Sequence, residues 1–414
     1  MKKIKFTPEL VCAVLFLIVI FLFGSITLVQ RIVSIGESLT KPFKNADSKS
    51  AMELYSDVHQ SFTKELEVES FTENLWNRLW FIDIYSVAQR ATLALVNEDE
   101  SETVVKDNHG YLHFVEPRLE AQTIEKYANN LIKLQESVEV PILFVQAPNK
   151  KLDGYTQLPK IFDNYSNDNA DDFLSLIEGK VDYLDLRDEV DKSFTDKSQL
   201  FYITDHHWTT ETAFWGYQKT AEKIKENYGI DLDPQGIYTD INNYEALEYP
   251  KSFLGAQGRR VGRYYTDIDD YTLLLPKFNT SFVTSEVLRP SGREPIRNVV
   301  GEGDFRQALI DEEILSSTDI TANKHGAYLS IDRGEQLIVN NLNPNGKKVV
   351  IIKDSFAMPY SCFMATGTAE TTILDMRYFS FVNRDIAAYI NEYSPDVVIF
   401  LYNTEAYTND MFVF

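Results

Sequence analysis

The sequence has little cysteine, and it has far fewer basic than acidic residues. Only Cys12 and Cys362 are cysteines among 414 residues, and Cys12 lies in an apolar N-terminal stretch, so we expect no disulfide between them. With 40 basic and 62 acidic residues, the formal net charge is -22. Such a surface repels nucleic acid and other polyanions at long range. We therefore expect no nucleic-acid partner, and a neutral substrate suits the chain better.

One long uncharged run begins near the N-terminus. Lys2, Lys3 and Lys5 precede it, and it extends from Leu10 to Gln30. A helix of about 20 residues spans the roughly 30 Å core of a bilayer. Because positive charge stays on the cytoplasmic side, residues 1–33 are predicted to be a single-pass membrane anchor that leaves the rest extracytoplasmic. A cleaved signal peptide is the alternative.

The remaining chain divides into two regions by pattern. Residues 34–100 contain amphipathic helical patches and are predicted to form a helical stalk or cap. Residues 101–414 alternate expected helices with buried apolar strands, which indicates an α/β domain with a parallel sheet and helices on both faces. The expected strands are Pro141–Gln146, Val181–Leu186, Lys348–Lys353, Thr371–Leu374 and Asp396–Leu401. Between about 231 and 347 short alternating runs replace this pattern, which favours a β-rich insertion or lid.

Several polar residues follow the expected strands directly. In an open parallel sheet, sites form beyond the carboxyl ends of the strands, so these residues should gather at one edge. Ser355 stands at a strand-to-helix turn, where backbone N–H groups can stabilise an oxyanion; a serine that merely caps the helix is the alternative. The candidates for substrate binding or for the oxyanion hole are Asn149, Arg377, Tyr378 and Asn403.

Two of the six histidines are adjacent in an Asp-His-His-Trp motif, residues 205–208. A serine nucleophile needs a base, and the base needs an orienting carboxylate. Because positions i and i+2 of an extended loop face the same way, Asp205 can hold one nitrogen of His207 while the other faces Ser355. His206 should point away, and Trp208 should pack to fix the loop.

A metal site is the competing interpretation of the same motif. Asp205, His206 and His207, together with His109 and His113, offer carboxylate and imidazole ligands. Asp-His-His also occurs in a family of manganese phosphoesterases, but that family carries further aspartate-rich motifs for which this chain offers no convincing counterpart. A serine triad that needs neither metal nor cofactor is therefore the favoured interpretation.

The motif of residues 205–208, followed much later by Asp354-Ser355-Phe356, resembles the DHHW family of SGNH hydrolase-like proteins. That family is related to accessory O-acetyltransferases of alginate and other polysaccharides. Residues 103–112 are similar to the Gly-aromatic-Leu strand that opens those domains. The resemblance covers about residues 100–414 and implies a flavodoxin-like α/β domain with Asp205, His207 and Ser355 as catalytic triad. The usual glycine before Asp-Ser is Lys353 here.

The resemblance also implies an activity and partners. It implies O-acetylation of a cell-surface or secreted polysaccharide through an acyl-Ser355 intermediate, with His207 as base. Because acetyl-CoA is absent outside the cytoplasm, a multi-pass membrane O-acyltransferase would supply the acyl group. Two alternatives remain: a carbohydrate esterase that uses the same triad, and a non-catalytic scaffold on the same fold.

Overall fold

The computed structural model of the chain describes residues 82–83, 86–87, 90, 96–98, 103–160, 162–289, 294–379, 385–409 and 411–412. The chain divides into two units, Met1–Ile84 and Tyr85–Phe414, and almost all described residues lie in the second. The predicted anchor and most of the predicted stalk lie outside the described residues. Within the described part, no helix is both long enough and apolar enough to cross a membrane.

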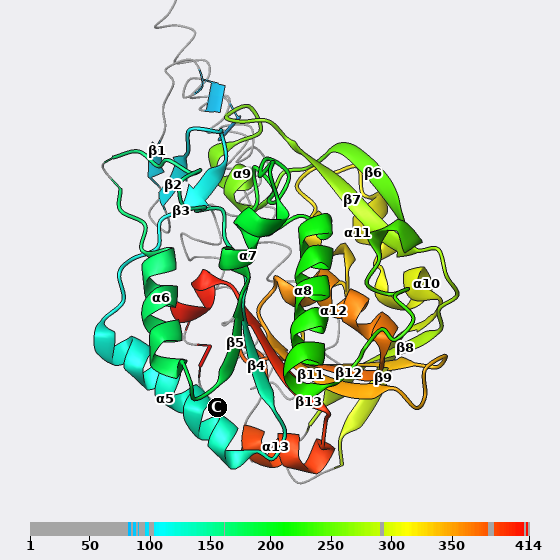
Figure 1. Cartoon of the computed structure of the whole chain (residues 1–414). Helices are drawn as coiled ribbons and strands as arrows, with labels where there is room; N and C mark the ends of the chain where they lie inside the picture. The colour runs from blue at the N-terminus through cyan, green and yellow to red at the C-terminus, as the bar shows by residue number, and fades with distance from the viewer. Residues whose placement is uncertain are drawn as a thin grey trace, which may run out of the picture. The chain divides into compact units, whose positions relative to one another are not determined.

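An eight-stranded mixed sheet organises the second unit (Figure 1). The strand order is β5-β4-β13-β11-β12-β10-β8-β9. The strands from β5 to β12 in this order are parallel, whereas β10, β8 and β9 are antiparallel to their neighbours. Their bounds are β4 Ile142–Gln146, β5 Asp182–Asp185, β8 Phe282–Leu288, β9 Ile296–Gly303, β10 Glu335–Asn340, β11 Lys347–Lys353, β12 Thr368–Asp375 and β13 Val397–Tyr402.

The parallel half of the sheet consists of the strands that the sequence predicted. The prediction of a wholly parallel sheet is only partly right, because β8, β9 and β10 continue the same sheet in antiparallel fashion. These strands come from the expected insertion, which does not simply form a lid. Antiparallel neighbours can follow one another through short connections, whereas a parallel neighbour requires a long crossover.

Helices cover both faces of the sheet. Successive residues of a strand point to opposite faces, so each buried strand contributes apolar side chains to two cores. In β4, Leu143 and Val145 belong to one core, and Ile142 and Phe144 belong to the other. The first core includes residues of α7 (Leu186–Ser193), α8 (Thr210–Tyr228) and α12 (Ala357–Gly367), and the second those of α5 (Ala121–Ser137), α6 (Ser166–Ile177) and α13 (Ile386–Tyr393) (Figure 1).

Two small sheets and several short helices complete this unit. The three-stranded sheet is antiparallel, as is the two-stranded one. Figure 1 shows the short helix α9 near β2 and β3, and it contacts both. The remaining bounds are β1 Val96–Glu98, β2 Thr103–Lys106, β3 Leu112–Phe114, β6 Tyr244–Phe253, β7 Asp269–Pro276, α9 Ala256–Val261, α10 Phe305–Leu309, α11 Glu312–Ser316, η2 Ile241–Asn243, η3 Lys324–Ala327 and η4 Thr404–Tyr407.

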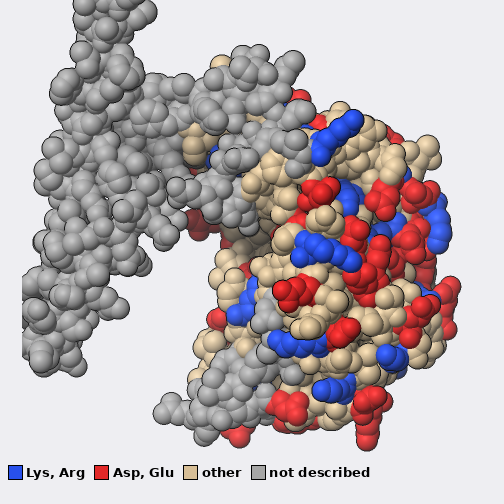
Figure 2. Space-filling view, turned by 90° about the vertical axis from the view of Figure 1, so that its left-hand side faces the viewer, with Lys and Arg blue, Asp and Glu red and all other residues tan. Residues whose placement is uncertain are grey.

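The surface carries acidic and basic side chains in close mixture. On the face shown in Figure 2, red acidic groups and blue basic groups are interspersed. Exposed pairs such as Arg118 and Asp172, 2.5 Å apart, illustrate how basic groups are matched locally. Such exposed pairs contribute little to stability, so the fold depends mainly on its two apolar cores.

We expect Ile352→Ala to lower the free energy of unfolding by about 2–5 kcal/mol, because it opens a cavity under the parallel sheet. Ile352 in β11 is 0% exposed, whereas Ile331 is 57% exposed and provides the matched control. Ile331→Ala should change stability by about 0.5 kcal/mol or less. Urea denaturation of the full chain in detergent measures both, and equal losses would contradict this assignment of the core.

Candidate active site

Two buried charged residues fix the backbone that leads into the Asp-His-His-Trp motif. Lys150, after β4, donates to the carbonyl oxygens of Tyr202 and Ile203 at 3.0 and 3.2 Å. Asp269, at the start of β7, accepts from the backbone N–H groups of Ile203 and Thr204. Burial lowers the pKa of Lys150 to about 8 and raises that of Asp269 to about 6. Buried charges require such partners, and here they hold three consecutive residues in one conformation.

Asp205 is buried against the N-terminus of α9. Its Oδ2 accepts from the backbone N–H of Ala256 at 2.8 Å, and its Oδ1 accepts from Nδ1–H of His207 at 2.5 Å. A Cβ atom on Gly255 would lie 2.1 Å from Asp205 Cβ, so only glycine fits there. Burial alone would raise the pKa of Asp205, but attraction to His207 and these hydrogen bonds hold it well below its usual value. Asp205 is thus a carboxylate aimed at the histidine.

His207 joins this carboxylate to Ser355. Its Nε2 lies 2.7 Å from Ser355 Oγ, across 148 residues of sequence. Ser355 occupies the turn between β11 and α12, where Phe356 is the N-cap residue. The serine hydroxyl therefore contacts the histidine instead of capping the helix. Burial, with His206 and His325 nearby, holds the pKa of His207 well below its usual value, so the imidazole is neutral and can accept a proton.

His325 contacts both His207 and the backbone of Ser355. Its ring stacks on that of His207 with centroids 3.7 Å apart, and its Nε2–H donates to the backbone carbonyl of Ser355 at 2.9 Å. Trp208 is fully buried, and its Nε1–H donates to the carbonyl of Phe356 at 3.0 Å. Sequence reasoning expected Trp208 to pack but did not select His325, for which the scarcity of histidine was the only signal.

Asp354 connects the ends of two neighbouring strands. Its carboxylate accepts from the backbone N–H groups of Phe356 at 2.9 Å and Asn403 at 2.6 Å. Burial raises the pKa of Asp354 to about 7. The Oδ1 of Asn403 accepts from the backbone N–H of Glu405 at 2.5 Å and caps η4. Asn403 is thus beside the nucleophile's turn, and its role in an oxyanion hole stays a prediction.

Arg377 is held by carboxylates, and Tyr378 lines a pocket other than the one beside His206. The Arg377 guanidinium is paired with Asp375 at 2.6 Å and with Asp332 at 3.1 Å, which leaves it committed to protein carboxylates. Tyr378 lines a different pocket and is exposed. Lys353, which replaces the usual glycine, is buried and forms ion pairs with the same two aspartates. A role of Arg377 and Tyr378 in substrate binding stays a prediction.

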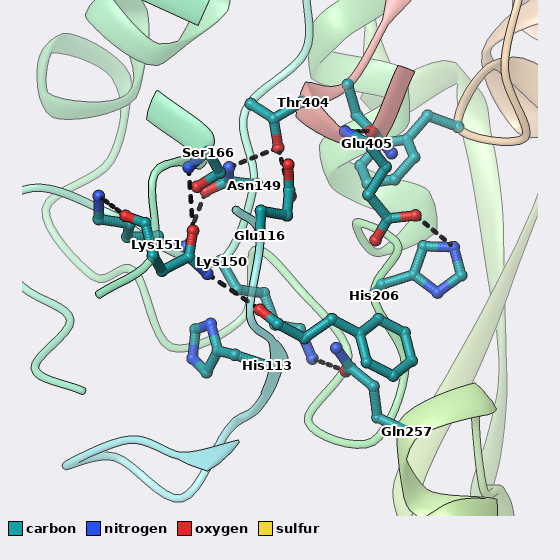
Figure 3. A pocket seen from close by; sticks show the side chains of 14 residues that line it. His113, Glu116, Asn149, Lys150, Lys151, Ser166, His206, Gln257, Thr404 and Glu405 are labelled. Atoms are coloured by element: carbon teal, nitrogen blue, oxygen red, sulfur yellow. Dashed lines mark hydrogen bonds and ion pairs between the residues drawn. The ribbon is translucent and has the colours of Figure 1, made fainter. Parts of the chain in front are cut away.

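A polar pocket adjoins the triad beside His206 and Phe356 (Figure 3). The loops after β4 and β13, the region around the start of α6 and part of α9 contribute to its walls. Asn149 lines it, as does Asn403, and Asn149 Nδ2 donates to Thr404 Oγ1 at 2.8 Å. Two residues predicted to bind substrate or to form the oxyanion hole thus meet at one pocket, which Phe356, the residue after Ser355, also lines.

The contacts within the motif suit a proton relay better than a metal site. Asp205, His206 and His207 offer ligand atoms within 4.8 Å of one another. However, Asp205 and His207 already bind each other, and the second nitrogen of His207 contacts Ser355. The other proposed ligands are engaged elsewhere, because His113 pairs with Asp107 at 2.9 Å and His109 stacks on Tyr155.

Comparison with known proteins agrees with the motif and the fold. Residues 114–248 match the family model described as SGNH hydrolase-like domain, acetyltransferase AlgX. PatB1 of Bacillus cereus has a similar structure, with a TM-score of 0.59 and 22% identity over 76% of this chain and 99% of that one. A structure of PatB1 with a sulfonyl adduct gives the same TM-score and identity, over 77% and 98% of the two chains.

A DHHW family protein from Eubacterium siraeum is also similar, with a TM-score of 0.54 and 16% identity over 75% of this chain and 93% of that one. The curated protein sequences give no match. At these identities, the likeness between structures shows the fold. The match of residues 114–248 to the SGNH hydrolase-like family model, together with this likeness of fold, confirms the resemblance that the sequence predicted.

Proposed function

We propose that the chain is a membrane-anchored, extracytoplasmic serine acyltransferase that O-acetylates a cell-surface or secreted polysaccharide. The continuous hydrogen-bonded series Asp205–His207–Ser355 carries this proposal. Further support comes from the match to an acetyltransferase family and from the likeness of the fold to DHHW and PatB1 proteins. The parallel half of the sheet, which presents Ser355 at a strand end, is the part that we regard as flavodoxin-like.

The first half-reaction forms an acyl-enzyme. Ser355 Oγ attacks the carbonyl carbon of the acyl donor while His207 Nε2 takes the hydroxyl proton, and Asp205 stabilises the resulting imidazolium. The bond between the acyl carbon and the donor's leaving group then breaks, and His207 returns the proton to that group. The products are the acetyl ester of Ser355 and the protonated leaving group.

The second half-reaction transfers the acyl group to a sugar. His207 removes a proton from a sugar hydroxyl, and the sugar oxygen attacks the acetyl-Ser355 carbonyl. The ester bond to Ser355 breaks, and His207 gives the proton back to Ser355 Oγ. Attack by water in place of the sugar would give hydrolysis, so the acceptor pocket decides between transferase and esterase.

The remaining parts of the proposal concern location and donor. Residues 1–33 would hold the enzyme at the membrane, next to a multi-pass O-acyltransferase that delivers the acyl group from the other side. No cofactor is required by this chemistry, because the serine itself carries the group. The structure of PatB1 with a sulfonyl adduct further suggests that a sulfonyl reagent is a suitable probe of Ser355.

Ser355→Ala should reduce turnover of p-nitrophenyl acetate by at least about 10³-fold, because the nucleophile is lost. In the unaltered chain, mass spectrometry should detect acetyl-Ser355 after reaction with p-nitrophenyl acetate. In a separate sample it should detect the adduct that Ser355 forms with a sulfonyl fluoride. Ser361→Ala, a buried serine in α12, is the matched control and should keep activity. Activity that survives in Ser355→Ala but disappears with EDTA would overturn the triad in favour of a metal.

Gly255→Ala should lower activity by a factor comparable to Asp205→Asn, about 10⁴-fold, because the added methyl displaces the carboxylate from His207. Gly326→Ala is the control, since the nearest atom to a Cβ there is 3.4 Å away. Circular dichroism verifies that both variants fold. Full activity in Gly255→Ala would show that Asp205 is not held as described.

The pH dependence of kcat/KM should follow the lowered pKa of His207. A general base must be unprotonated, so activity falls only when the pH drops through that pKa, which lies below the usual histidine value of about 6.5. Initial rates with p-nitrophenyl acetate from pH 4 to 8 test this on the full chain. An acid limb centred above about pH 7 would contradict a buried, neutral His207.

A further inference from the structure

The strand β9 forms one edge of the central sheet. It lies at the opposite end of the sheet from β5, and among the described residues it pairs with β8 alone (Figure 1). An edge strand presents a row of N–H and C=O groups to which a further strand can pair. Edges are commonly protected by being short or by containing proline, but β9 has eight residues and no proline. The other edge, β5, has only four residues, two of which are aspartates.

Apolar side chains of β9 are exposed to solvent. Ile296, Val299 and Val300 are 48, 60 and 47% exposed. Leu288, at the end of the neighbouring strand β8, is 44% exposed. Branched side chains of this kind pack well against a neighbouring strand, and a long apolar edge is a typical surface for the addition of a strand from a partner.

A β-bulge interrupts the pairing of β9 with β8. Val299 pairs with Ser285 and Gly301 pairs with Thr284, so Val300 is the extra residue. A bulge increases the local twist of a strand and so discourages pairing with an ordinary straight strand. A second copy of β9 has the same bulge and the same twist, which favours the chain itself as the partner.

The bulge also places two opposite charges on one face of β9. Arg297, Val299 and Glu302 share this face because they pair with alternate residues of β8, namely Val287, Ser285 and Val283. Counted in paired positions, Arg297 is two before Val299 and Glu302 is two after it. Without the bulge, Arg297 and Glu302 would point to opposite faces. The strand is therefore symmetric about Val299 in position and opposite in charge.

These two charged side chains are not used within the described part of the chain. Arg297 and Glu302 are both exposed, and neither forms an ion pair with a described residue. Four paired positions separate them, which is about 13 Å along the strand, so they cannot meet within one chain. Each would meet its complement only on another strand.

We propose that β9 is a self-association edge, which pairs antiparallel with β9 of a second copy about a two-fold axis at Val299. The axis exchanges positions before and after Val299, so Arg297 of each copy faces Glu302 of the other. Ile296 then faces Gly303, where the absence of a side chain leaves room for it. The central sheet continues from one copy into the next, and this pairing does not depend on the acyl-transfer function.

Sedimentation velocity of the full chain in detergent should show a reversible equilibrium of monomer and dimer between about 1 and 200 µM. Val299→Lys places two ammonium groups opposite each other at the axis and should raise the dissociation constant at least about tenfold. Leu342→Lys is the matched control, because Leu342 is 59% exposed and lies outside β8 and β9, and it should leave association unchanged. Circular dichroism verifies that each variant folds.

Charge exchange tests the register of the pairing. Arg297→Glu and Glu302→Arg should each weaken association about tenfold, because each sets like charges opposite each other at two places in the interface. The double variant with both substitutions exchanges the charges and should regain the association of the unaltered chain. Single variants that associate normally, or a double variant that fails to recover, would overturn the proposed register.

Disulfide cross-linking measures the same register in chains that also carry Cys12→Ser, with Cys362 left in its buried place. Val299→Cys should form a linked dimer on mild oxidation, because its two thiols meet at the axis. Glu302→Cys alone should not link, since its thiols lie about 13 Å apart along the strands. An equimolar mixture of Arg297→Cys and Glu302→Cys chains should link to each other.

The outcomes decide between a second copy and other occupants of the edge. A chain that stays monomeric at about 200 µM overturns the proposal and leaves the edge to a strand of another protein. A dimer that Val299→Lys does not weaken forms through a different surface and overturns it equally. Weakening by Val299→Lys, recovery in the double charge variant and linkage through Val299→Cys together establish it.

Discussion

The candidate catalytic centre depends on one crowded contact, in which the Asp205 carboxylate lies against the backbone of residues 255 and 256. Asp205 cannot retreat from His207 because α9 closes the space behind it. The contact leaves no room for a side chain at position 255, and in return it supplies a backbone N–H to the carboxylate. The orientation of the base is therefore set by a short helix outside the central sheet.

Three buried ionisable side chains near this contact, Lys150, Asp269 and Asp354, form hydrogen bonds with backbone groups. Lys150 meets carbonyl oxygens, whereas Asp269 and Asp354 meet N–H groups. Hydrogen bonds of this kind are strong in a dry interior, and they are costly to leave incomplete. Because a change of backbone conformation would break several of these hydrogen bonds together, few alternative conformations are possible here. Glu116 differs from these residues, because its Oε2 is buried and has no hydrogen-bond partner among the described residues.

Much of the fold and the core of the site could be predicted from the sequence, because both leave local patterns. Buried parallel strands are short apolar runs, and the spacing of Asp205 and His207 places them on one side of a loop. The antiparallel continuation of the sheet leaves no such pattern, since strand partners are chosen at long range. His325, Gly255 and Glu116 reach the site in the same way, from segments whose sequences show nothing unusual.

The partners of Arg377 could not be predicted from its place in the sequence. Its place after a strand was correctly identified, but the sequence does not reveal that Asp332, from a distant segment, pairs with its guanidinium. A strand end predicts which edge of the sheet a residue occupies, and it does not predict which groups the side chain meets there. Asn149 and Asn403 follow strands in the same way and do reach the pocket.

The separation of 148 positions in sequence from His207 to Ser355 has a consequence for the biosynthesis of the protein. A growing chain that has emerged as far as α8 already contains the proposed base and its carboxylate, but it does not yet contain the proposed nucleophile. Ser355 is synthesised only after β11. Its strand has its native neighbour only when β13, the last strand in the sequence, has paired with β11. Under the proposed mechanism, chains cut short before this point hold an intact motif but are inactive, so reactivity at Ser355 would report that the whole domain has folded.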